Sequence, residues 1–160
     1  MMETREYEQL ALESGVYKDI ELDILMDTLA SWRKQPGDPY SLVEIRDGQQ
    51  PAGFCLFQRA TNTDYTFDIH TFLIGRNYRG KKAAEKLLEL LVEDILSKSP
   101  SAMLRIETSS LKESAIEPGF FASQGFETIG HIPDFYGSGN DYFIFALHVL
   151  REQEDKGTEA

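Results

Sequence analysis

Four of the sixteen basic residues of this chain lie within seven positions, where they could bind an anion. The segment FLIGRNYRGKKAAEKLL, residues 72–88, contains Arg76, Arg79, Lys81 and Lys82 between an apolar run and a helix-forming run. The first turn of a helix exposes unpaired N–H groups and is itself partly positive, so each cation there destabilises the helix by roughly 0.3–1 kcal/mol. This placement predicts a site for an anion such as a pyrophosphate. The alternative is ordinary solvated surface charge, and neither the GxxxxGK[ST] nor the GxGxxG phosphate motif is present.

Two titratable side chains just upstream could transfer a proton. The run YTFDIHTFLI reads as a strand, whose alternation predicts two faces, one with Asp68, His70 and Phe72 and the other with Phe67, Ile69 and Leu73. An imidazole with a pKa of about 6.5 suits proton transfer near neutral pH, whereas a carboxyl group with a pKa of about 4 needs burial or a bound water. The alternative is that Asp68 and His70 hydrogen-bond each other or a loop and only complete a sheet.

The elements that must position these residues follow from hydrophobic periodicity. Residues 16–37 predict a helix that ends at Pro36-Gly37 and has an apolar stripe formed by Ile20, Ile24, Leu25, Thr28, Leu29 and Trp32. Strands are predicted at about 41–46, 52–59 and 65–74, separated by the turn clusters RDGQQP and ATNTD, as an antiparallel meander. Residues 81–99 predict a second amphipathic helix.

The second half of the chain predicts the rest of one sheet. The strand AMLRIET follows the second helix, so it pairs in parallel with the strand before that helix. A short helix from about Glu117-Pro118 to Gly125 precedes two closing strands, ETIGHIPDFY and YFIFALHVL. No repeat or long linker divides the chain, which predicts a single domain over residues 1–150 and a polar, frayed tail over residues 151–160.

Composition limits the function classes. The formal net charge is −11, with 27 acidic against 16 basic residues. This excess of negative charge argues against nucleic acid as a partner and favours a cationic acceptor. The alternative is that the negative charge only keeps the protein soluble. No segment approaches the roughly 20 apolar residues that span a bilayer, and the N-terminal residues carry no secretory pattern, so we expect a cytoplasmic protein without a membrane partner. The single cysteine, Cys55, lies in an apolar run that predicts an inert buried thiol, and no clustered ligand set predicts a metal site.

The segment DIHTFLIGRNYRGKKAAEKLL resembles the acetyl-CoA-binding segment of the GNAT (general N-acetyltransferase) superfamily, in which a strand leads into an R/Q-x-x-G-x-G/A turn and a long helix. On this chain the turn comprises Arg79, Gly80, Lys81, Lys82, Ala83 and Ala84. Arg79, Gly80 and Ala84 match the pattern, whereas Lys82 stands where glycine is usual. In a helical conformation Lys82 would still offer its N–H group to a phosphate.

The resemblance covers about residues 40–148 and includes the SQGF sequence that ends the short helix. It implies an α/β (α+β) fold with a twisted mixed sheet of about six or seven strands flanked by helices. It also implies that the backbone of Phe72, Leu73 and Ile74 pairs with the pantetheine arm of the coenzyme. Asp68 and His70 match positions at which the family often carries its general base.

Two further family positions differ in this chain. Phe121 stands where many members place a tyrosine that protonates the departing thiolate, and Ser114 stands where an asparagine is common. Either Tyr136 or Tyr142 could replace the missing phenol from the closing strands, or the thiolate could leave unassisted. Tyr136 and Asp134 are expected near the acceptor pocket, with a turn carboxylate and a half-buried ring as the alternative.

The resemblance therefore implies an N-acetyltransferase that moves an acetyl group from acetyl-CoA to a primary amine, expected to be a small cationic molecule, by direct attack in a ternary complex. A protein N-terminus or lysine is a further acceptor class. The alternative is a non-catalytic acyl-CoA sensor or an interaction module of the same fold. A homodimer is compatible with this interpretation.

Overall fold

The computed structural model describes residues 4–80 and 82–152. Its helices are α1 (Arg5–Ser14), α2 (Asp19–Lys34), the 3-10 helix η1 (Arg76–Tyr78), α3 (Ala83–Leu96), α4 (Ser110–Ser114) and α5 (Phe120–Ser123). Its strands are β1 (Ser41–Asp47), β2 (Gln50–Arg59), β3 (Thr66–Ile74), β4 (Ser101–Ser109), β5 (Glu127–Gly137) and β6 (Asn140–Leu150). No helix in these two ranges is long and apolar enough to cross a membrane.

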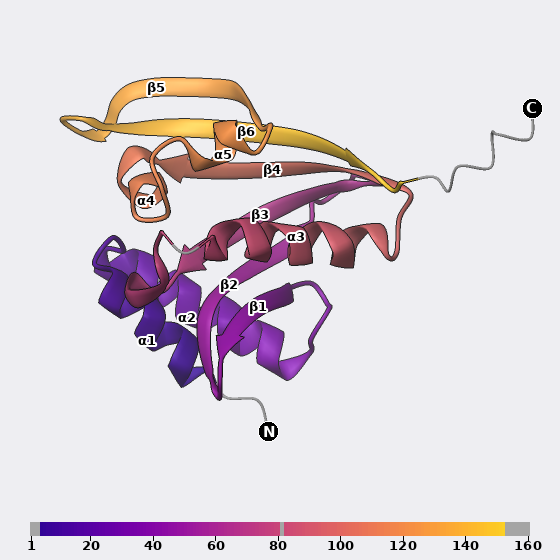
Figure 1. The fold of residues 1–160 in the computed structure, drawn as a ribbon, viewed down its shortest axis with the longest axis horizontal. Helices are drawn as coiled ribbons and strands as arrows, with labels where there is room; N and C mark the ends of the chain where they lie inside the picture. The colour runs from indigo at the N-terminus through magenta and orange to yellow at the C-terminus, as the bar shows by residue number, and fades with distance from the viewer. Residues whose placement is uncertain (1–3, 81, 153–160) are drawn as a thin grey trace, which may run out of the picture.

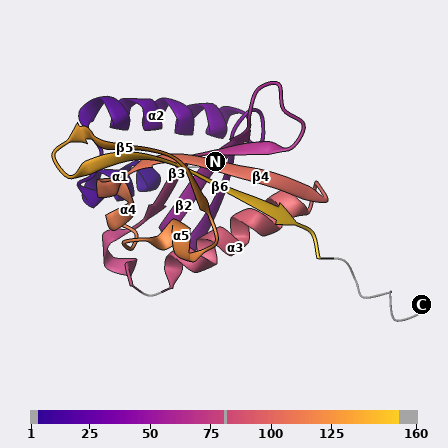
Figure 2. The same cartoon turned by 90° about the horizontal axis from the view of Figure 1, so that it is seen from above.

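The six strands form one mixed sheet in the order β1-β2-β3-β4-β6-β5. The β1-β2-β3 part is the predicted antiparallel meander, and β3 and β4 are the predicted parallel pair, joined through α3. The strand β6 inserts between β4 and β5 and is antiparallel to both. Figure 1 shows this arrangement, and Figure 2 shows α2 and α3 on opposite faces of the sheet.

The parallel pair at the centre of the sheet separates partway along its length. Backbone pairing joins Thr66–Ile69 of β3 to Met103–Ile106 of β4 and does not continue, although β3 runs on to Ile74 and β4 to Ser109. In Figure 1 the two strands lie together at one end and diverge towards α4 and η1 at the other. The sheet therefore contains a fork, which opens at the ends of β3 and β4 that precede η1 and α4.

A β-bulge in β3 changes which side chains share a face. Leu56 of β2 pairs with Thr71 and Phe57 pairs with Ile69, so His70 is the extra residue. Because a bulge interrupts the alternation, Phe72 packs in the same apolar cluster as Ile69. The prediction that Phe72 shares the face of Asp68 and His70 is therefore wrong, and Leu73 packs in the opposite cluster.

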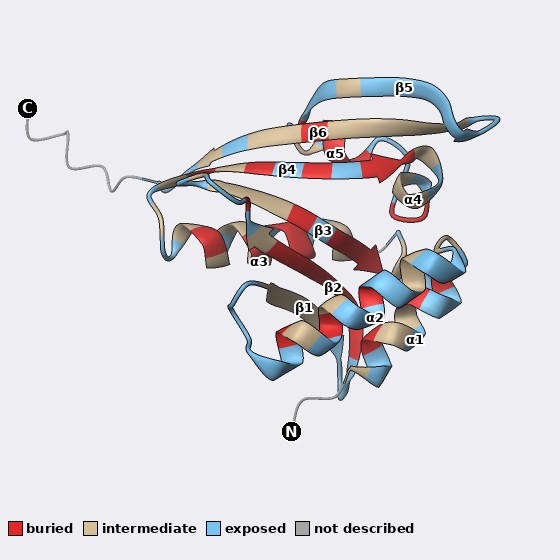
Figure 3. Cartoon of the chain, turned by 180° about the vertical axis from the view of Figure 1, so that it is seen from behind, coloured by how far each residue is buried: buried red, intermediate tan, exposed pale blue. Residues whose placement is uncertain are grey.

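Two apolar cores cover the two faces of the sheet. The first lies against α3 and α5 and contains the fully buried side chains of Leu87, Leu91 and Leu104. The second lies against α1 and α2 and contains Leu29 and Phe54. Figure 3 shows how buried residues run along β2, β3 and β4 while β5 at the sheet edge stays exposed.

The apolar stripe of α2 is narrower than its sequence predicts. Leu25, Leu29 and Trp32 are buried, but Ile20 and Ile24 are 68% and 60% exposed. The helix α1, which the sequence analysis did not predict, packs against α2 and contributes Tyr7 and Ala11 to the same core. Burial of this core therefore uses one side of α2 and leaves its Ile20–Ile24 side to solvent.

This difference is testable within one helix. The Leu29→Ala variant should lose about 2–5 kcal/mol of unfolding free energy, because it opens a cavity in the second core. The Ile24→Ala variant should stay within about 0.5 kcal/mol of the parent, since its side chain is already in water. Urea unfolding followed by far-UV circular dichroism measures both, and similar losses in the two variants would contradict the assigned burial.

Candidate active site

A cavity of about 250 Å³ lies where β3 passes through η1 into the start of α3. The predicted turn residues Arg79, Gly80, Lys82, Ala83 and Ala84 all line it. The remaining lining residues come from the end of β3, from η1 and from the segment between α4 and α5: Ile74, Tyr78, Glu85, Ile116, Glu117 and Phe120. Lys81, the other predicted member of the turn, lies outside the described residues.

Arg79 carries the clearest sign of a missing anion. Its Nε and Nη2 atoms are buried and have no hydrogen-bond partner among the described residues. Burial, and then the positive charge of Arg76, lowers the pKa of the Arg79 guanidinium. Because a buried polar group without a partner costs about 1–3 kcal/mol and a charged one more, an anion held by both nitrogens would remove that cost.

The backbone of the turn also presents donors to the cavity. Lys82 precedes α3 in the left-handed conformation with φ of 61°, and Gly80 has φ of 75°. The prediction of a helical Lys82 is therefore wrong. The backbone of this lysine adopts a left-handed conformation that glycine adopts without strain. The first backbone bond that closes the helix runs from Lys86 N–H to Lys82 O at 3.2 Å, so the N–H groups of Ala83 and Ala84 lack helical partners.

The cavity is not uniformly cationic, because Glu85 and Glu117 also line it. Among the described residues the positive groups in the lining are Arg79 and Lys82. An anion would therefore be recognised by the directed N–H groups of the guanidinium and the helix start more than by net charge.

The fork leaves one edge of β3 without a strand neighbour in the described chain. From His70 to Ile74 the strand pairs with β2 on one side only, so backbone groups that point away from β2 are free to pair with an extended ligand. The Phe72 side chain is anchored in the first core, with ring centroids 5.8 Å from Phe120 and 5.5 Å from Phe121. The predicted pantetheine-pairing segment, Phe72–Ile74, is thus a strand edge without a strand partner among the described residues, and its side chains are buried.

The two other residues assigned to the coenzyme lie apart from the cavity lining. Phe121 is completely buried and packs edge-on against Phe126 in the first core, while its neighbour Phe120 reaches the cavity. The Ser114 hydroxyl donates to the Leu111 carbonyl oxygen at 2.9 Å within α4 and is not part of that lining.

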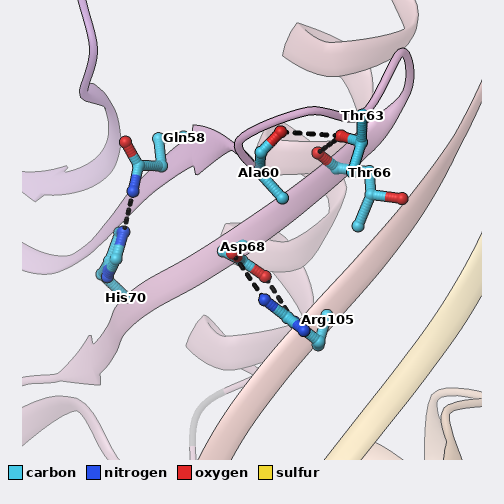
Figure 4. Close-up of polar contacts among 7 residues, drawn as sticks. All are labelled: Gln58, Ala60, Thr63, Thr66, Asp68, His70 and Arg105. Carbon is cyan, nitrogen blue, oxygen red and sulfur yellow. Dashed lines mark hydrogen bonds and ion pairs between the residues drawn. The ribbon is translucent and has the colours of Figure 1, made fainter.

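Asp68 does not face His70 as a hydrogen-bonding partner; it forms a bidentate ion pair with Arg105 of β4. Arg105 Nε and Nη2 lie 2.6 and 2.8 Å from the two Asp68 oxygens, as Figure 4 shows. The two residues are direct partners in the parallel register of β3 and β4. Hydrogen bonding to Asp68 raises the pKa of Arg105. The ion pair thus connects the strands just before they separate.

His70, the bulge residue, contacts Gln58 and Tyr40. The Gln58 amide nitrogen lies 2.8 Å from His70 Nε2, so the amide donates and the neutral imidazole accepts (Figure 4). The Tyr40 ring lies edge-on to the imidazole with centroids 5.4 Å apart. Although His70 is exposed, desolvation lowers its pKa, and the negative charge of Asp68 opposes this shift only partly.

Asp68, His70 and Arg105 line a notch of about 230 Å³ together with Ile69 and Glu107. The notch lies at the last paired positions of β3 and β4, on the face opposite α3. Arg105 and Glu107 were not predicted as site residues. The alternation of the segment RIET, residues 105–108, could have indicated them, since residues 105 and 107 of a strand share one face.

Tyr136 belongs to an aromatic group on the β5–β6 hairpin. Its ring centroid lies 4.8 Å from that of Phe135 and 6.3 Å from that of Tyr142. Burial, then the charges of Glu21 and Glu107, raises the pKa of Tyr136, so its hydroxyl lies in the field of both α2 and β4. Asp134 instead accepts the Gly139 N–H at 2.7 Å in the hairpin turn, as the alternative interpretation predicted.

Cys55 is fully buried in β2, as predicted, and desolvation raises the pKa of its thiol. A buried, protonated thiol is not a nucleophile. Within residues 4–80 and 82–152, no group of three or more His, Cys, Asp or Glu side chains could hold a metal ion.

The lowered pKa of His70 makes a pH-dependent prediction. Because the folded-state pKa lies below the unfolded value of about 6.5, unfolding takes up a proton as pH falls below that value, and His70 then reduces stability. The His70→Gln variant should therefore lose less unfolding free energy than the parent between pH 7.5 and pH 5.5. Urea unfolding at both pH values measures the difference, and parallel pH dependences in the two proteins would contradict the shift.

Comparison with solved structures identifies the architecture. A protein from Desulfovibrio desulfuricans assigned to the GNAT family of acetyltransferases has a TM-score of 0.77 at 20% identity, covering 91% of each chain. An aminoglycoside 6′-N-acetyltransferase complexed with coenzyme A has a TM-score of 0.68 at 13% identity, covering 94% of this chain and 93% of its own. A Salmonella typhimurium protein assigned as an acetyltransferase and solved with acetyl-CoA has a TM-score of 0.66 at 17% identity, covering 96% and 90%.

The sequence comparison names the family. No curated protein matched the sequence. The family model of the acetyltransferase (GNAT) family matches residues 5–126, which is most of the chain. The predicted fold class and the predicted acetyltransferase class are confirmed. This chain belongs to the GNAT family of acetyltransferases.

Proposed function

We propose that this protein transfers an acetyl group from acetyl-CoA to a primary amine by direct attack in a ternary complex. The observation that carries the proposal is the Arg79 guanidinium, with two buried nitrogens that lack partners at the start of α3. A pyrophosphate has the charge and the acceptor oxygens that this guanidinium and the free helix N–H groups require.

The fork supports the position of the rest of the coenzyme. From Ile74 at the cavity to Ile69 at the notch, β3 covers five residues, or roughly 15 Å. An extended pantetheine arm along the free edge of β3 would connect the two cavities and bring the thioester towards the notch. Bound acetyl-CoA would supply the acetyl carbonyl that the amine attacks, and a free backbone N–H of Phe72–Ile74 would polarise it.

Direct attack is favoured over an acyl-enzyme. The single thiol, Cys55, is buried and held in its protonated form, so it cannot accept the acetyl group. The net charge of −11 favours a cationic acceptor, and one protein of the same fold is an aminoglycoside acetyltransferase. We therefore propose a small cationic amine as the acceptor class.

Position 121 carries a phenylalanine, so it offers no hydroxyl to the departing thiolate, and its ring is buried in the first core. Two phenols of the closing strands, Tyr136 and Tyr142, lie in the field of Glu107, and their raised pKa values keep them protonated. A thiol with a pKa of about 8.5 is also a tolerable leaving group without assistance.

A non-catalytic acyl-CoA sensor is the second candidate. It is favoured by the Asp68–Arg105 ion pair, which engages both oxygens of a residue predicted as the base, and by the buried Phe121. A sensor would keep the cavity at α3 and the fork but would release no thiol with any amine.

The coenzyme site is tested by calorimetry with coenzyme A. The Arg79→Met variant should bind it about 10- to 100-fold more weakly, because a charge-assisted hydrogen bond contributes about 1.5–3 kcal/mol. The control is Arg33→Met, which removes an exposed cation on α2 and should bind like the parent. Equal affinity of both variants would reject the assigned pyrophosphate site.

Turnover separates the enzyme from the sensor. Release of free coenzyme A from acetyl-CoA is followed with a thiol reagent in the presence of spermidine, an aminoglycoside and peptides with a free N-terminus or lysine. The enzyme should release thiol with at least one of these amines. Tight coenzyme binding without release for any amine would favour the sensor instead.

A further inference from the structure

We propose that Glu107 is the catalytic residue that takes the proton from the ammonium group of the acceptor amine. This inference rests on the proposed function and adds the base to it. Glu107 lies on β4 in the lining of the notch.

Glu107 lies at the point where the fork begins. Ile106 pairs with Ile69 in the last parallel register, and Glu107 is the next residue along β4. Its side chain is exposed on the same face as Arg105, so it projects where the strands have already separated. A thioester that extended along the free edge of β3 towards Ile69 would end beside this carboxylate.

The other two titratable groups of the notch that could act as bases are already engaged. Both oxygens of Asp68 accept hydrogen bonds from Arg105, so protonation of Asp68 would break a bidentate ion pair. The Nε2 lone pair of His70 accepts the Gln58 amide. Glu107 is the remaining carboxylate in the notch lining, and it forms no ion pair within the described part of the chain.

The surroundings of Glu107 fit an incoming ammonium group. The cation nearest in sequence on this face, Arg105, is directed to Asp68. Burial, and then the nearby Glu107 carboxylate, raises the pKa of Tyr142, so this phenol lies beside Glu107. Tyr136 lies in the field of the same carboxylate, so aromatic rings stand beside the negative charge, an arrangement that attracts organic cations.

The proposed step balances as follows. The bound R-NH3⁺ gives one proton to the Glu107 carboxylate, and the nitrogen lone pair forms the bond to the acetyl carbon. The carbon–sulfur bond breaks with its electron pair on sulfur. The thiolate takes the second proton from nitrogen, the third stays on the amide, and Glu107 returns its proton to solvent. The products are the N-acetyl amine, coenzyme A as a free thiol and one released proton.

The test uses the intact protein and the amine of the panel above that gives the fastest thiol release. The Glu107→Gln variant keeps the size of the side chain and should lower kcat by about 10²-fold or more, with coenzyme A affinity unchanged. The Glu107→Asp variant should recover part of the loss. Glu93→Gln, an exposed change on α3, is the matched control and should keep the parental kcat.

A pH profile separates a base from a structural role. Without Glu107 only amine that is already neutral in solution can react, so the deficit of the Gln variant should shrink between about pH 7 and pH 9. A structural defect would give a ratio of variant to parental kcat that stays constant across this pH range. The titratable or charged groups around Glu107 are Asp68 and His70 on β3, Arg105 on β4, Tyr136 on β5 and Tyr142 on β6, and Glu21 on α2 acts on Tyr136 in turn.

Three outcomes would overturn the proposal. They are parental kcat in the folded Glu107→Gln variant, a deficit that does not change with pH, and a larger, pH-dependent loss in His70→Gln than in Glu107→Gln. Thermal melting shows whether the Glu107→Gln variant is folded. If it is misfolded, the kcat and the pH profile of Glu107→Asp decide whether Glu107 is the base. If the parent binds coenzyme A but acetylates no amine in the panel, the role of Glu107 is rejected while the coenzyme site stands. If the parent binds no coenzyme A, the proposed function itself fails.

Discussion

The separation of β3 from β4 after Ile69 and Ile106 is the feature on which the rest of the structure depends. Backbone N–H and C=O groups are obligatory hydrogen-bonding groups, so a central strand that loses its neighbour must find another partner. The Asp68–Arg105 ion pair lies one position before the last parallel pair, and the bulge at His70 lies one position after it. The fork thereby creates two features: the free edge of β3, which leads to the cavity at the turn before α3, and the notch on the face of the sheet opposite α3.

Two sites with different electrostatics meet at this fork. The turn end is built from a desolvated guanidinium and helix N–H groups, which suit an anion. The notch contains Glu107 and a neutral imidazole beside phenols, which suit a cation. The rigid apolar cores behind them, with Phe72 packed on Phe120 and Phe121, hold the strand edge that would connect the two ligands. In the proposed reaction each substrate meets the charge it requires, and β3 sets their separation.

Several parts of this molecule were predictable because their causes are local. The strands over residues 41–47, 50–59 and 66–74 and the helix at 83–96 follow from periodicity, and the parallel β3–β4 pair follows from the intervening helix. The bulge was not predictable, because one extra residue leaves no compositional mark and reverses every later side chain of the strand. The exposure of Ile20 and Ile24 also escaped prediction, since it depends on where α1 packs.

The sequence by itself determined the cationic turn, its position at the start of a helix and the family to which the chain belongs, because short spacings and the order of elements carry these properties. Only the tertiary structure decided how the charges divide. Asp68 pairs with Arg105, which lies 37 positions away in the chain, and that pairing leaves Glu107 as the carboxylate in the notch without a cationic partner among the described residues. Which carboxylate is neutralised depends on the register between two strands, and register is set by the packing of the whole sheet rather than by the residues of either strand.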